Sequence, residues 1–569
     1  MTATEAKPAG RVAHAFGDAI ARLHTRIGGD PSATGLVERL AQQLWSDAEA
    51  GHVCTEVGDD DERRQLASSP VVDVAPEVHE AALVLDGDAL YLQRLWRAEA
   101  LLAARVAALD APAALGDAAA VADVVDSLFE PAESDEAQRG ALLRALGHRL
   151  TLLSGGPGTG KTTTLARLLV AFARLAPDAR VAFAAPTGKA AARLGQSLSD
   201  QLARFDPTGE LRARLPRAGT TLHRLLGLRA KAAAASVTMP LDHDLVIVDE
   251  ASMLDVEIAA ALVGAIGANG RLVLAGDRDQ LASVEAGAVF ADLCASASGA
   301  TVQLSRNHRQ KDAAHIVALA AQVRDAGSSP AMLHWPASIG RFRPDPAAIV
   351  DDALAAWGEV REAIEARATP AKVLAACERH RVLTAMRQGP LGSVALNRRI
   401  AGAVRRAAGT GVAASPLAQW YPGRLVLVTV NRPALGLFNG DVGVCLPDPD
   451  ASIGANGKRR DGLVVAFADA DAPRLFPVAQ MPACEDAWAM TVHKAQGSEF
   501  ESVALVLAPP GHPLNTRELV YTGITRARSR LAIWSEPDVV AQAALSRTTR
   551  RGRLAQRLVA HGADAVRPR

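Results

Sequence analysis

Residues 155–162, GGPGTGKT, form a glycine-rich loop between the apolar run TLLSG and a segment, TTLARLLVAFARL, whose apolar residues recur at helical spacing. Glycines let the backbone N–H groups of such a loop point inward around phosphate, and the N-terminus of the next helix adds a favourable dipole. The loop matches the pattern G-x-x-x-x-G-K-[ST] in full. It therefore predicts a buried strand, a phosphate-binding loop and a helix, which together constrain this part of the chain to an α/β fold.

Two side chains of the loop have expected tasks. Lys161 is expected to neutralise the β and γ phosphates of a nucleotide, and the hydroxyl of Thr162 is expected to bind Mg²⁺. The loop alone indicates only nucleotide binding, because transporters, kinases and molecular switches share it. The residues expected to contact the nucleotide are Gly155, Gly156, Pro157, Gly158, Thr159, Gly160, Lys161, Thr162 and Thr163.

Three further apolar runs follow the loop, and each ends in polar or glycine residues: RVAFAAP, LVIVDE and RLVLAGD. Buried parallel strands have this composition, and ligands bind at the carboxyl ends of such strands in open α/β sheets. We therefore expect the polar motifs to meet at one edge of a sheet. A later series, HRVLTAM, SVALVLAP and RLAIW, predicts a second α/β domain.

Acidic and amide side chains follow two of these runs. After VIV, Asp249 is expected to hold the metal ion, and Glu250 to orient or deprotonate the attacking water. After LAG, Asp277 and Gln280 are expected to sense the γ-phosphate and to relay its loss to other elements.

Hydrolysis of a γ-phosphate also requires positive charge, because negative charge spreads over its equatorial oxygens in the transition state. The candidates are Arg309 in LSRNHRQ and Arg526 in YTGITRARSRL. Each stands in a polar segment outside the first loop. The sequence therefore predicts a hydrolysis site assembled from several segments.

Length and composition limit the classes of protein. A chain of 569 residues predicts roughly three to five domains. Lys plus Arg and Asp plus Glu both number 62, so any contact with nucleic acid must come from a local groove. No apolar run of about 18 residues and no signal peptide is evident, and we expect a cytoplasmic protein. The five cysteines lack a C-x-x-C pair, which argues against a zinc site or disulfide scaffold.

Patterning divides the chain into domains. Residues 1–125 contain amphipathic segments such as ALYLQRLWRAEALLAARVAAL and predict a helical N-terminal domain. A stretch with proline and acidic residues, Pro131 to Asp135, marks its boundary. The two α/β domains are expected at 126–325 and 326–569.

The second α/β domain contains an insertion. The segments LVLVTVNRPALGLFNGDVGVCLP and GLVVAFADADAPRLFPV alternate apolar and polar residues, with a turn signal at Asn439 and Gly440. They predict a small β-barrel at about 420–485.

In order and spacing these motifs resemble superfamily 1 helicases, from the phosphate loop to the last arginine motif. Four segments are similar to the branch that contains the RecD and Pif helicases: APTGKAA at 185–191, TLHRLLG at 221–227, DEASM at 249–253 and VHKAQGSEF at 492–500. This resemblance implies two RecA-like motor domains and an SH3-like inserted barrel, which would either close over a bound DNA strand or serve as a scaffold. It also implies ATP and Mg²⁺ as cofactors, and 5′-to-3′ movement along DNA.

The resemblance assigns roles to individual residues. It makes Gln138 the glutamine that contacts adenine, and Arg309 and Arg526 the arginines that contact the γ-phosphate. The residues that it places in catalysis are Lys161, Asp249, Glu250, Gln280, Arg309 and Arg526, with Thr162 and Asp249 at the metal ion. The residues that it places on DNA are Thr187, Lys189, Thr221, His223, Thr491, His493 and Lys494.

The N-terminal segment LVLDGDALYLQRLWRAE resembles the RecD subunits of RecBCD complexes, also called exodeoxyribonuclease V. This resemblance implies a heterotrimer with RecB-like and RecC-like subunits, in which the N-terminal domain docks on its partners. The complex would act on single-stranded DNA and duplex DNA ends in recombinational repair. No second carboxylate cluster of nuclease type is evident, so the nuclease site is expected in a partner.

Three alternatives remain beside this interpretation. A stand-alone RecD-like helicase typically carries tandem helix-hairpin-helix elements in its N-terminal region, and these are not evident here. A non-enzymatic docking or clamp subunit would not need intact catalytic positions. Another P-loop enzyme, such as a nucleotide kinase, would not need a second α/β domain with its own arginine motif.

One segment departs from the pattern of the family. Between TLHRLLG and the acidic pair, only RAKAAAASVTMPLDHD is present where relatives carry a strand-splitting pin. Either another subunit supplies the wedge, or this chain translocates along DNA better than it unwinds duplex alone.

Overall fold

The computed structural model describes most of the chain. The described residues are 10–130, 135–206, 209–210, 215, 219–228, 240–306, 313–327, 333–407, 419–448, 462–469 and 472–566. Arg309, the predicted domain boundary at 131–134 and most of the short pin segment (229–239) lie outside these ranges. None of the described helices combines the length and the apolar character needed to cross a membrane.

The first α/β unit is built on six parallel strands in the order β10-β5-β9-β8-β6-β7. Alternate residues of β8 face opposite cores: Ile247 packs with helix α7, whereas Val248 packs with helix α11. Because both faces are covered, the inner strands β6 and β8 are apolar throughout, as the sequence predicted. The strands are β5 (Leu150–Gly155), β6 (Val181–Ala185), β7 (Thr220–Thr221), β8 (Leu245–Val248), β9 (Arg271–Gly276) and β10 (Thr301–Leu304).

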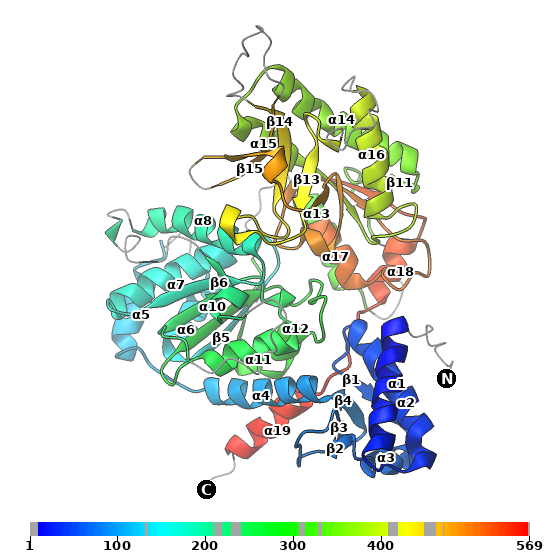
Figure 1. Cartoon of the computed structure of the whole chain (residues 1–569). Coiled ribbons are helices and arrows are strands. Elements are labelled where there is room, and N and C mark those ends of the chain that lie inside the picture. Colours follow the sequence, from blue (N-terminus) through cyan, green and yellow to red (C-terminus); the bar gives the residue numbers. More distant parts are fainter. Residues whose placement is uncertain are drawn as a thin grey trace.

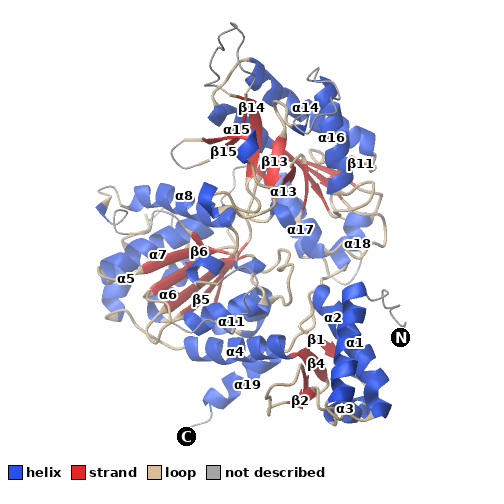
Figure 2. Ribbon diagram, viewed as in Figure 1, coloured by secondary structure: helices blue, strands red, loops and turns tan. Residues whose placement is uncertain are grey.

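Helices cover both faces of this sheet (Figures 1 and 2). Helix α5 packs in the same core as α6 and α7, although nearly all of it falls within the N-terminal domain predicted at 1–125. The helices are α5 (Ala118–Asp126), α6 (Glu136–Gly147), α7 (Lys161–Leu175), α8 (Gly188–Phe205), α10 (Leu222–Leu225), α11 (Val256–Ala265) and α12 (Val289–Ser296).

The second α/β unit has five parallel strands in the order β11-β20-β19-β12-β18. The prediction of two α/β units with parallel sheets is therefore confirmed. The strands are β11 (Gly340–Phe342), β12 (His380–Thr384), β18 (Ala489–Thr491), β19 (Phe500–Val506) and β20 (Ala527–Trp534). The helices are α13 (Ala314–Arg324), α14 (Pro346–Glu365), α15 (Pro370–Arg379), α16 (Ser393–Ala407), α17 (Arg517–Thr525) and α18 (Val539–Leu545).

An antiparallel sheet stands between α16 and β18, where the sequence predicted an insertion. Its order is β16-β15-β14-β13-β17, so β16 and β17 lie at its two edges. An SH3-like barrel at this position remains a prediction. The strands are β13 (Leu425–Val428), β14 (Val442–Pro447), β15 (Leu463–Phe467), β16 (Arg474–Pro477) and β17 (Cys484–Asp486).

The N-terminal region combines helices with a four-stranded sheet in the order β1-β4-β3-β2. The prediction of a helical domain missed this sheet, because its strands are only three or four residues long and β4 runs directly into α4. The elements are α1 (Arg11–Arg26), α2 (Thr34–Glu49), β1 (Cys54–Glu56), α3 (Asp60–Ala67), β2 (Val72–Val74), β3 (Leu83–Asp86), β4 (Ala89–Leu92) and α4 (Gln93–Leu109).

The end of the chain returns to this N-terminal region. Helix α19 (Leu554–Val566) packs against α4, and Leu554 and Leu558 lie in the core that α4 shares with α11. Figure 1 shows α19, in red, beside α4. The N-terminal region, the first α/β unit and the last helix therefore share one core.

Candidate nucleotide and DNA site

The glycine-rich loop has the shape that its sequence predicts. Gly158 and Gly160 have φ angles of 80° and 85°, which glycine adopts without steric cost. Helix α7 begins directly after them at Lys161. The Nζ of Lys161 donates to the carbonyl oxygens of Gly155 at 2.6 Å and Gly156 at 3.1 Å, so the ammonium group is held over the loop.

A cavity of about 550 Å³ opens at this loop and reaches the second α/β unit. Most of the predicted nucleotide and catalytic residues line it, whereas Gly155, Gly156 and Thr159 are not part of the lining. Thr159 instead donates its hydroxyl to the carbonyl of Gly156 at 2.8 Å. The predicted residues in the lining are Gln138, Pro157, Gly158, Gly160, Lys161, Thr162, Thr163, Asp249, Glu250, Asp277, Gln280 and Arg526.

The acidic pair follows β8, as predicted, and lies opposite the loop. Glu250 has a φ of 54°, a left-handed conformation that costs a non-glycine residue about 1–3 kcal/mol and often marks a functional site. Burial raises the pKa of both carboxyl groups; Lys161 opposes this rise at Asp249, and Arg526 opposes it at Glu250. Glu250 therefore has the environment of a group that exchanges a proton with water.

Thr162 and Asp249 line the same cavity and carry oxygen donors, which Mg²⁺ prefers. A nucleotide-bound Mg²⁺ needs only one or two protein ligands, because phosphates and water supply the rest. The two residues therefore fit the ion. Within the described ranges, no group of three or more His, Cys, Asp or Glu residues could hold a metal ion.

The residues after β9 connect the two α/β units. The Oδ2 of Asp277 accepts hydrogen bonds from Gln280 Nε2 at 3.1 Å and from the Tyr521 hydroxyl at 3.0 Å. Gln280 is therefore held toward the cavity by Asp277, and Asp277 is held by a helix of the second unit. Sequence reasoning missed Tyr521, although it stands five residues before Arg526.

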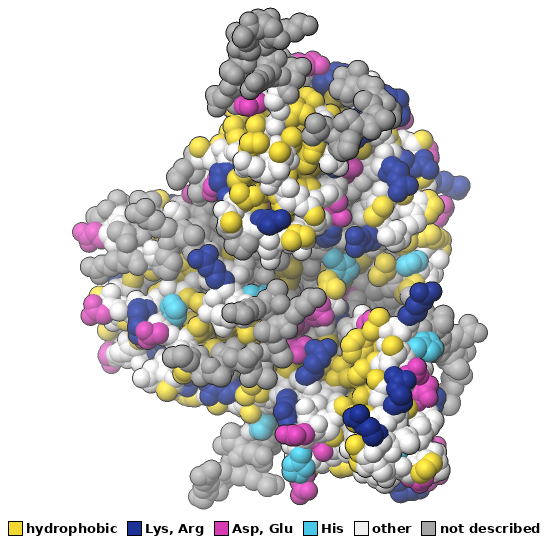
Figure 3. All heavy atoms as spheres, in the orientation of Figure 1, with side chains coloured by type: hydrophobic (Ala, Val, Ile, Leu, Met, Phe, Trp, Pro, Cys, Tyr) yellow, Lys and Arg dark blue, Asp and Glu magenta, His cyan; other side chains and the backbone are white. Residues whose placement is uncertain are grey.

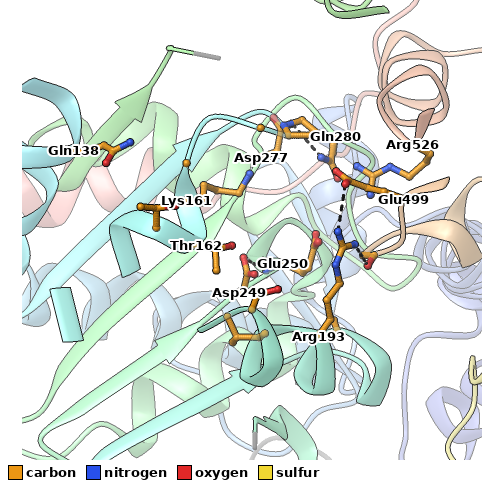
Figure 4. Close-up of a pocket in the computed structure, with 18 of the residues that line it drawn as sticks. Gln138, Lys161, Thr162, Arg193, Asp249, Glu250, Asp277, Gln280, Glu499 and Arg526 are labelled. Carbon is orange, nitrogen blue, oxygen red and sulfur yellow. Dashed lines mark hydrogen bonds and ion pairs between the residues drawn. The ribbon is translucent and has the colours of Figure 1, made fainter. Parts of the chain in front are cut away.

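Arg526 reaches the cavity from the second unit and is only 2% exposed. Its guanidinium donates to the carbonyl oxygens of Ser498 at 3.1 Å and Thr522 at 3.2 Å. Figure 4 shows it across the cavity from Lys161 and Thr162. The other predicted arginine, Arg309, lies outside the described residues; Arg306 lines the cavity.

Arg193 and Glu499 line the cavity without having been predicted. Arg193, on α8, donates to the carbonyl of Gly497 at 2.8 Å and to the Glu499 carboxylate at 3.3 Å (Figure 4). Glu499 also accepts from Arg528 at 3.2 Å. Arg193 thus bridges the two units directly at the cavity.

Gln138 lies at the far end of the cavity from Arg526 (Figure 4). It is 3% exposed, and its Oε1 accepts a hydrogen bond from Arg167 Nη1 at 2.6 Å. The guanidinium of Arg167 stacks over the Phe129 ring at 4.4 Å. Arg167 therefore fixes the amide of Gln138, and an adenine contact at this end remains a prediction.

The predicted DNA residues stand at the carboxyl ends of β6, β7 and β18, outside the lining of the nucleotide cavity. Their threonines act as caps in this structure. Thr187 Oγ1 accepts from Ala190 N, Thr221 Oγ1 from Arg224 N, and Thr491 Oγ1 from Lys494 N, at 3.2, 3.3 and 3.4 Å. These cap hydrogen bonds account for a threonine at each position without any contact to DNA, so the DNA contacts of the three residues remain predictions.

Two lysines of this set lie near acidic residues of the second unit and its insertion. Lys494 pairs with Glu485, and burial lowers the pKa of Lys189 to about 8, near Glu378 and Asp441. A Cβ atom on Gly188 would lie 3.1 Å from that of Phe438, so the insertion touches the start of α8. On the face in Figure 3, Lys and Arg are interspersed with Asp and Glu.

Comparisons with known proteins agree with this arrangement. Residues 133–344 match the AAA domain, and residues 486–534 match the UvrD-like helicase C-terminal domain. The chain is 37% identical over 488 residues to RecBCD enzyme subunit RecD of Mycolicibacterium smegmatis, covering 82% of this chain and 81% of that protein.

A second mycobacterial relative is RecBCD enzyme subunit RecD of Mycobacterium tuberculosis, 36% identical over 522 residues, or 87% of this chain and 84% of that protein. The ATP-dependent RecD2 DNA helicase of Deinococcus radiodurans is 33% identical over 85% of this chain and 60% of that protein. Identity of this level over most of the length establishes the family. The chain belongs to the RecD family.

Proposed function

We propose that this chain is a motor that moves 5′ to 3′ along single-stranded DNA as one subunit of a heterotrimeric helicase and nuclease. Its partners would be RecB-like and RecC-like subunits, and its substrate would be the duplex DNA end that is processed in recombinational repair. The mycobacterial relatives are named as RecBCD subunits, which supports this assembly. The observation that carries the motor function is a single cavity that both α/β units line.

The residues of this cavity divide the work of hydrolysis. Lys161 would exchange the carbonyls of Gly155 and Gly156 for phosphate oxygens of ATP. Thr162 and Asp249 would hold Mg²⁺, which neutralises phosphate charge when it is bound. Glu250 would orient the attacking water and accept its proton, because burial raises its pKa. Arg526 would counter the charge that develops on the γ-phosphate.

Hydrolysis can move the two units relative to each other because hydrogen bonds join them beside the cavity. Arg193 contacts Gly497 and Glu499, Tyr521 contacts Asp277, and the Thr522 hydroxyl accepts from the Leu281 N–H at 2.9 Å. Loss of the γ-phosphate would free Arg526 and Gln280, and these bonds would then transmit a change of angle between the units. Alternating grip on a strand of DNA then gives directional stepping.

The DNA would lie across the carboxyl ends of β6, β7 and β18. Lys189 and the loop that carries Phe438 meet there, which supports a role for the insertion in closing over the strand. Phosphate contacts and base stacking bind single strands with little sequence preference.

Unwinding of 5′-tailed and 3′-tailed duplexes, with and without the partner subunits, tests the proposal. We expect ATP turnover that single-stranded DNA stimulates, and a preference for 5′ tails. A preference for 3′ tails would overturn the polarity. Absence of ATP turnover would instead favour a docking subunit, and turnover that DNA does not stimulate would favour another nucleotide enzyme. Nucleolysis by the chain alone would contradict the placement of the nuclease site in a partner.

A further inference from the structure

The segment 281–288 connects the γ-phosphate sensors Asp277 and Gln280 to helix α12, and it contains no helix or strand. Contacts from other parts of the chain must therefore fix its shape. The second α/β unit holds its first residue at both backbone groups. The N–H of Leu281 donates to Thr522 Oγ1 at 2.9 Å, and its carbonyl accepts from Gln496 Nε2 at 2.7 Å.

Arg550 holds the remainder of this segment. Its Nη2 donates to the carbonyl of Ser283 at 2.5 Å, and its Nη1 donates to the carbonyls of Glu285 at 2.5 Å and Gly287 at 3.2 Å. In the part of the chain that the structure describes, no carboxylate forms an ion pair with Arg550. A guanidinium bound to several carbonyls fixes their relative positions, because its donors form a rigid planar fork.

Arg550 also joins this segment to the N-terminal region. Gly51, which follows α2, has a φ of 89°, and a Cβ atom there would lie 2.5 Å from Arg550 Nη1. The carbonyl of Gly51 accepts from Gly287 N at 2.9 Å and from Arg550 Nη1 at 3.5 Å. The guanidinium therefore fills a space that only glycine leaves open, and three distant parts of the sequence meet around it.

The chain around Arg550 is anchored on both sides. Before it, the N–H and hydroxyl of Thr548 donate to the Glu518 carboxylate of α17 at 2.9 and 2.8 Å. After it, the carbonyl of Arg551 accepts from Val53 N at 2.7 Å, and the N–H of Arg553 donates to Glu99 at 2.9 Å. Helix α17 also carries Tyr521 and Thr522 and ends at Thr525, directly before Arg526, so a closed ring of contacts links the sensors to the arginine of the cavity.

We propose that Arg550 is a positioning residue for ATP hydrolysis. It fixes segment 281–288 against α17 and the N-terminal region, so that Asp277 and Gln280 on one side and Arg526 on the other stand in register for the γ-phosphate. This inference rests on the proposed function of the cavity. It adds that the N-terminal region, where partner subunits are proposed to dock, is joined to the segment that follows the nucleotide sensors by Arg550 and by the hydrogen bond from Gly287 N to the Gly51 carbonyl.

The test measures ATP turnover and nucleotide binding of the full chain with single-stranded DNA. In Arg550→Gln we expect kcat to fall roughly tenfold to a hundredfold, since small displacements of catalytic groups have effects of this size. Binding of a fluorescent ATP analogue should change less than about threefold, because the phosphate loop makes no contact with Arg550. Arg550→Lys keeps the charge and the aliphatic stem but lacks the fork, and it should lose most of the same activity.

Arg551→Gln is the matched control. The substitution lies on the same segment and removes an ion pair with Asp47 at 2.6 Å, but among the described residues the Arg551 side chain forms no hydrogen bond or ion pair with segment 281–288. We expect kcat close to that of the unaltered chain. Equal losses in Arg551→Gln and Arg550→Gln would overturn the proposal, because they would reflect a loosened C-terminal segment.

Two further outcomes keep the result interpretable. If Arg550→Gln does not fold, Arg550→Lys carries the test, and full activity of the lysine variant overturns the proposal. Failure of the proposed function appears instead in the unaltered chain, as an absence of DNA-stimulated turnover. A fall in kcat and in nucleotide affinity by the same factor would also overturn a positioning role, because it would show that the nucleotide loop itself was disturbed.

Discussion

The two halves of the nucleotide cavity are held in different ways. On the first α/β unit, Lys161 is held by Gly155 and Gly156, and the N–H of Glu250 donates to Asp249 at 2.9 Å, so close neighbours in sequence fix the groups. Where the first unit meets the second, the groups depend on partners far away in sequence: Arg193 of the first unit and Gly497 of the second are 304 positions apart, and Asp277 of the first and Tyr521 of the second are 244 apart.

This difference separates nucleotide binding from hydrolysis. The phosphate-binding half keeps its shape whatever the second unit does, because its contacts lie within one loop and the start of one helix. The half that carries Arg526 faces the phosphates only when the two units are correctly placed relative to each other. Substitutions in the first half should therefore affect binding and turnover together, whereas substitutions in the second should affect mainly turnover.

Lys161→Gln is expected to have the largest effect. It removes the ammonium group that faces the phosphates, and DNA-stimulated ATP hydrolysis should fall below detection while nucleotide affinity also drops. The fold should persist, because Lys161 lies at the mouth of a loop and outside the apolar cores. Phosphate release and circular dichroism measure the two properties. Lys372→Gln, at an exposed position of α15, is the control, and turnover above a tenth of the normal rate in Lys161→Gln would refute the assignment.

Arg526→Lys should lower kcat by about 10³-fold while nucleotide binding stays nearly unchanged. The lysine keeps the charge but cannot contact Ser498 and Thr522 together as the guanidinium does. Rapid-quench kinetics and binding of a fluorescent ATP analogue separate the two quantities. Arg528→Lys, on the adjacent exposed side chain, should behave normally. If nucleotide affinity fell as much as kcat, both halves of the cavity would contribute to nucleotide binding, and the contrast between them would fail.

Arg193→Gln should have a smaller effect of the same kind. It removes a bridge between the units but leaves Arg526 in place. We expect kcat to fall about tenfold, which is the effect of losing one charge-assisted hydrogen bond. The stimulation of turnover by DNA should fall with it. Gln196→Ala, at an exposed position of the same helix, is the control. A normal DNA stimulation factor in Arg193→Gln would show that this bridge carries no coupling.

The same contrast explains what the sequence could predict. Strands β5, β8 and β9 and the residues at their ends were predictable, because burial on both faces makes a strand uniformly apolar and a ligand edge makes its end polar. Lys161 and Asp249 follow from such local patterns. Arg193 lies four residues after Lys189 on α8, so helical spacing could have placed the two on one face. Nothing local distinguishes it from a solvated arginine.

Other features depend on contacts that no local pattern encodes. The N-terminal sheet was missed because its short strands merge with the helical pattern of α4. The return of the chain to the N-terminal region was missed because Arg550 and Arg551 occur in a polar segment, TTRRGR, that resembles an ordinary surface run. In the structure, carbonyls of Ser283 and Glu285 surround Arg550. Tertiary placement gives these arginines their partners.

Lys189 should give the smallest effect, and it tests the DNA side of the comparison. Burial between the two units lowers the pKa of Lys189 to about 8, which is well below the usual value for a lysine. The side chain is therefore mostly charged at pH 7 and mostly neutral at pH 9. If Lys189 contacts phosphate, the salt dependence of single-stranded DNA binding should weaken by about 0.7 in logarithmic slope between these pH values. In Lys189→Arg the charge persists at both pH values, and the slope should stay constant. An equal change of slope in both proteins would assign the titration to another group and would remove Lys189 from the DNA interface.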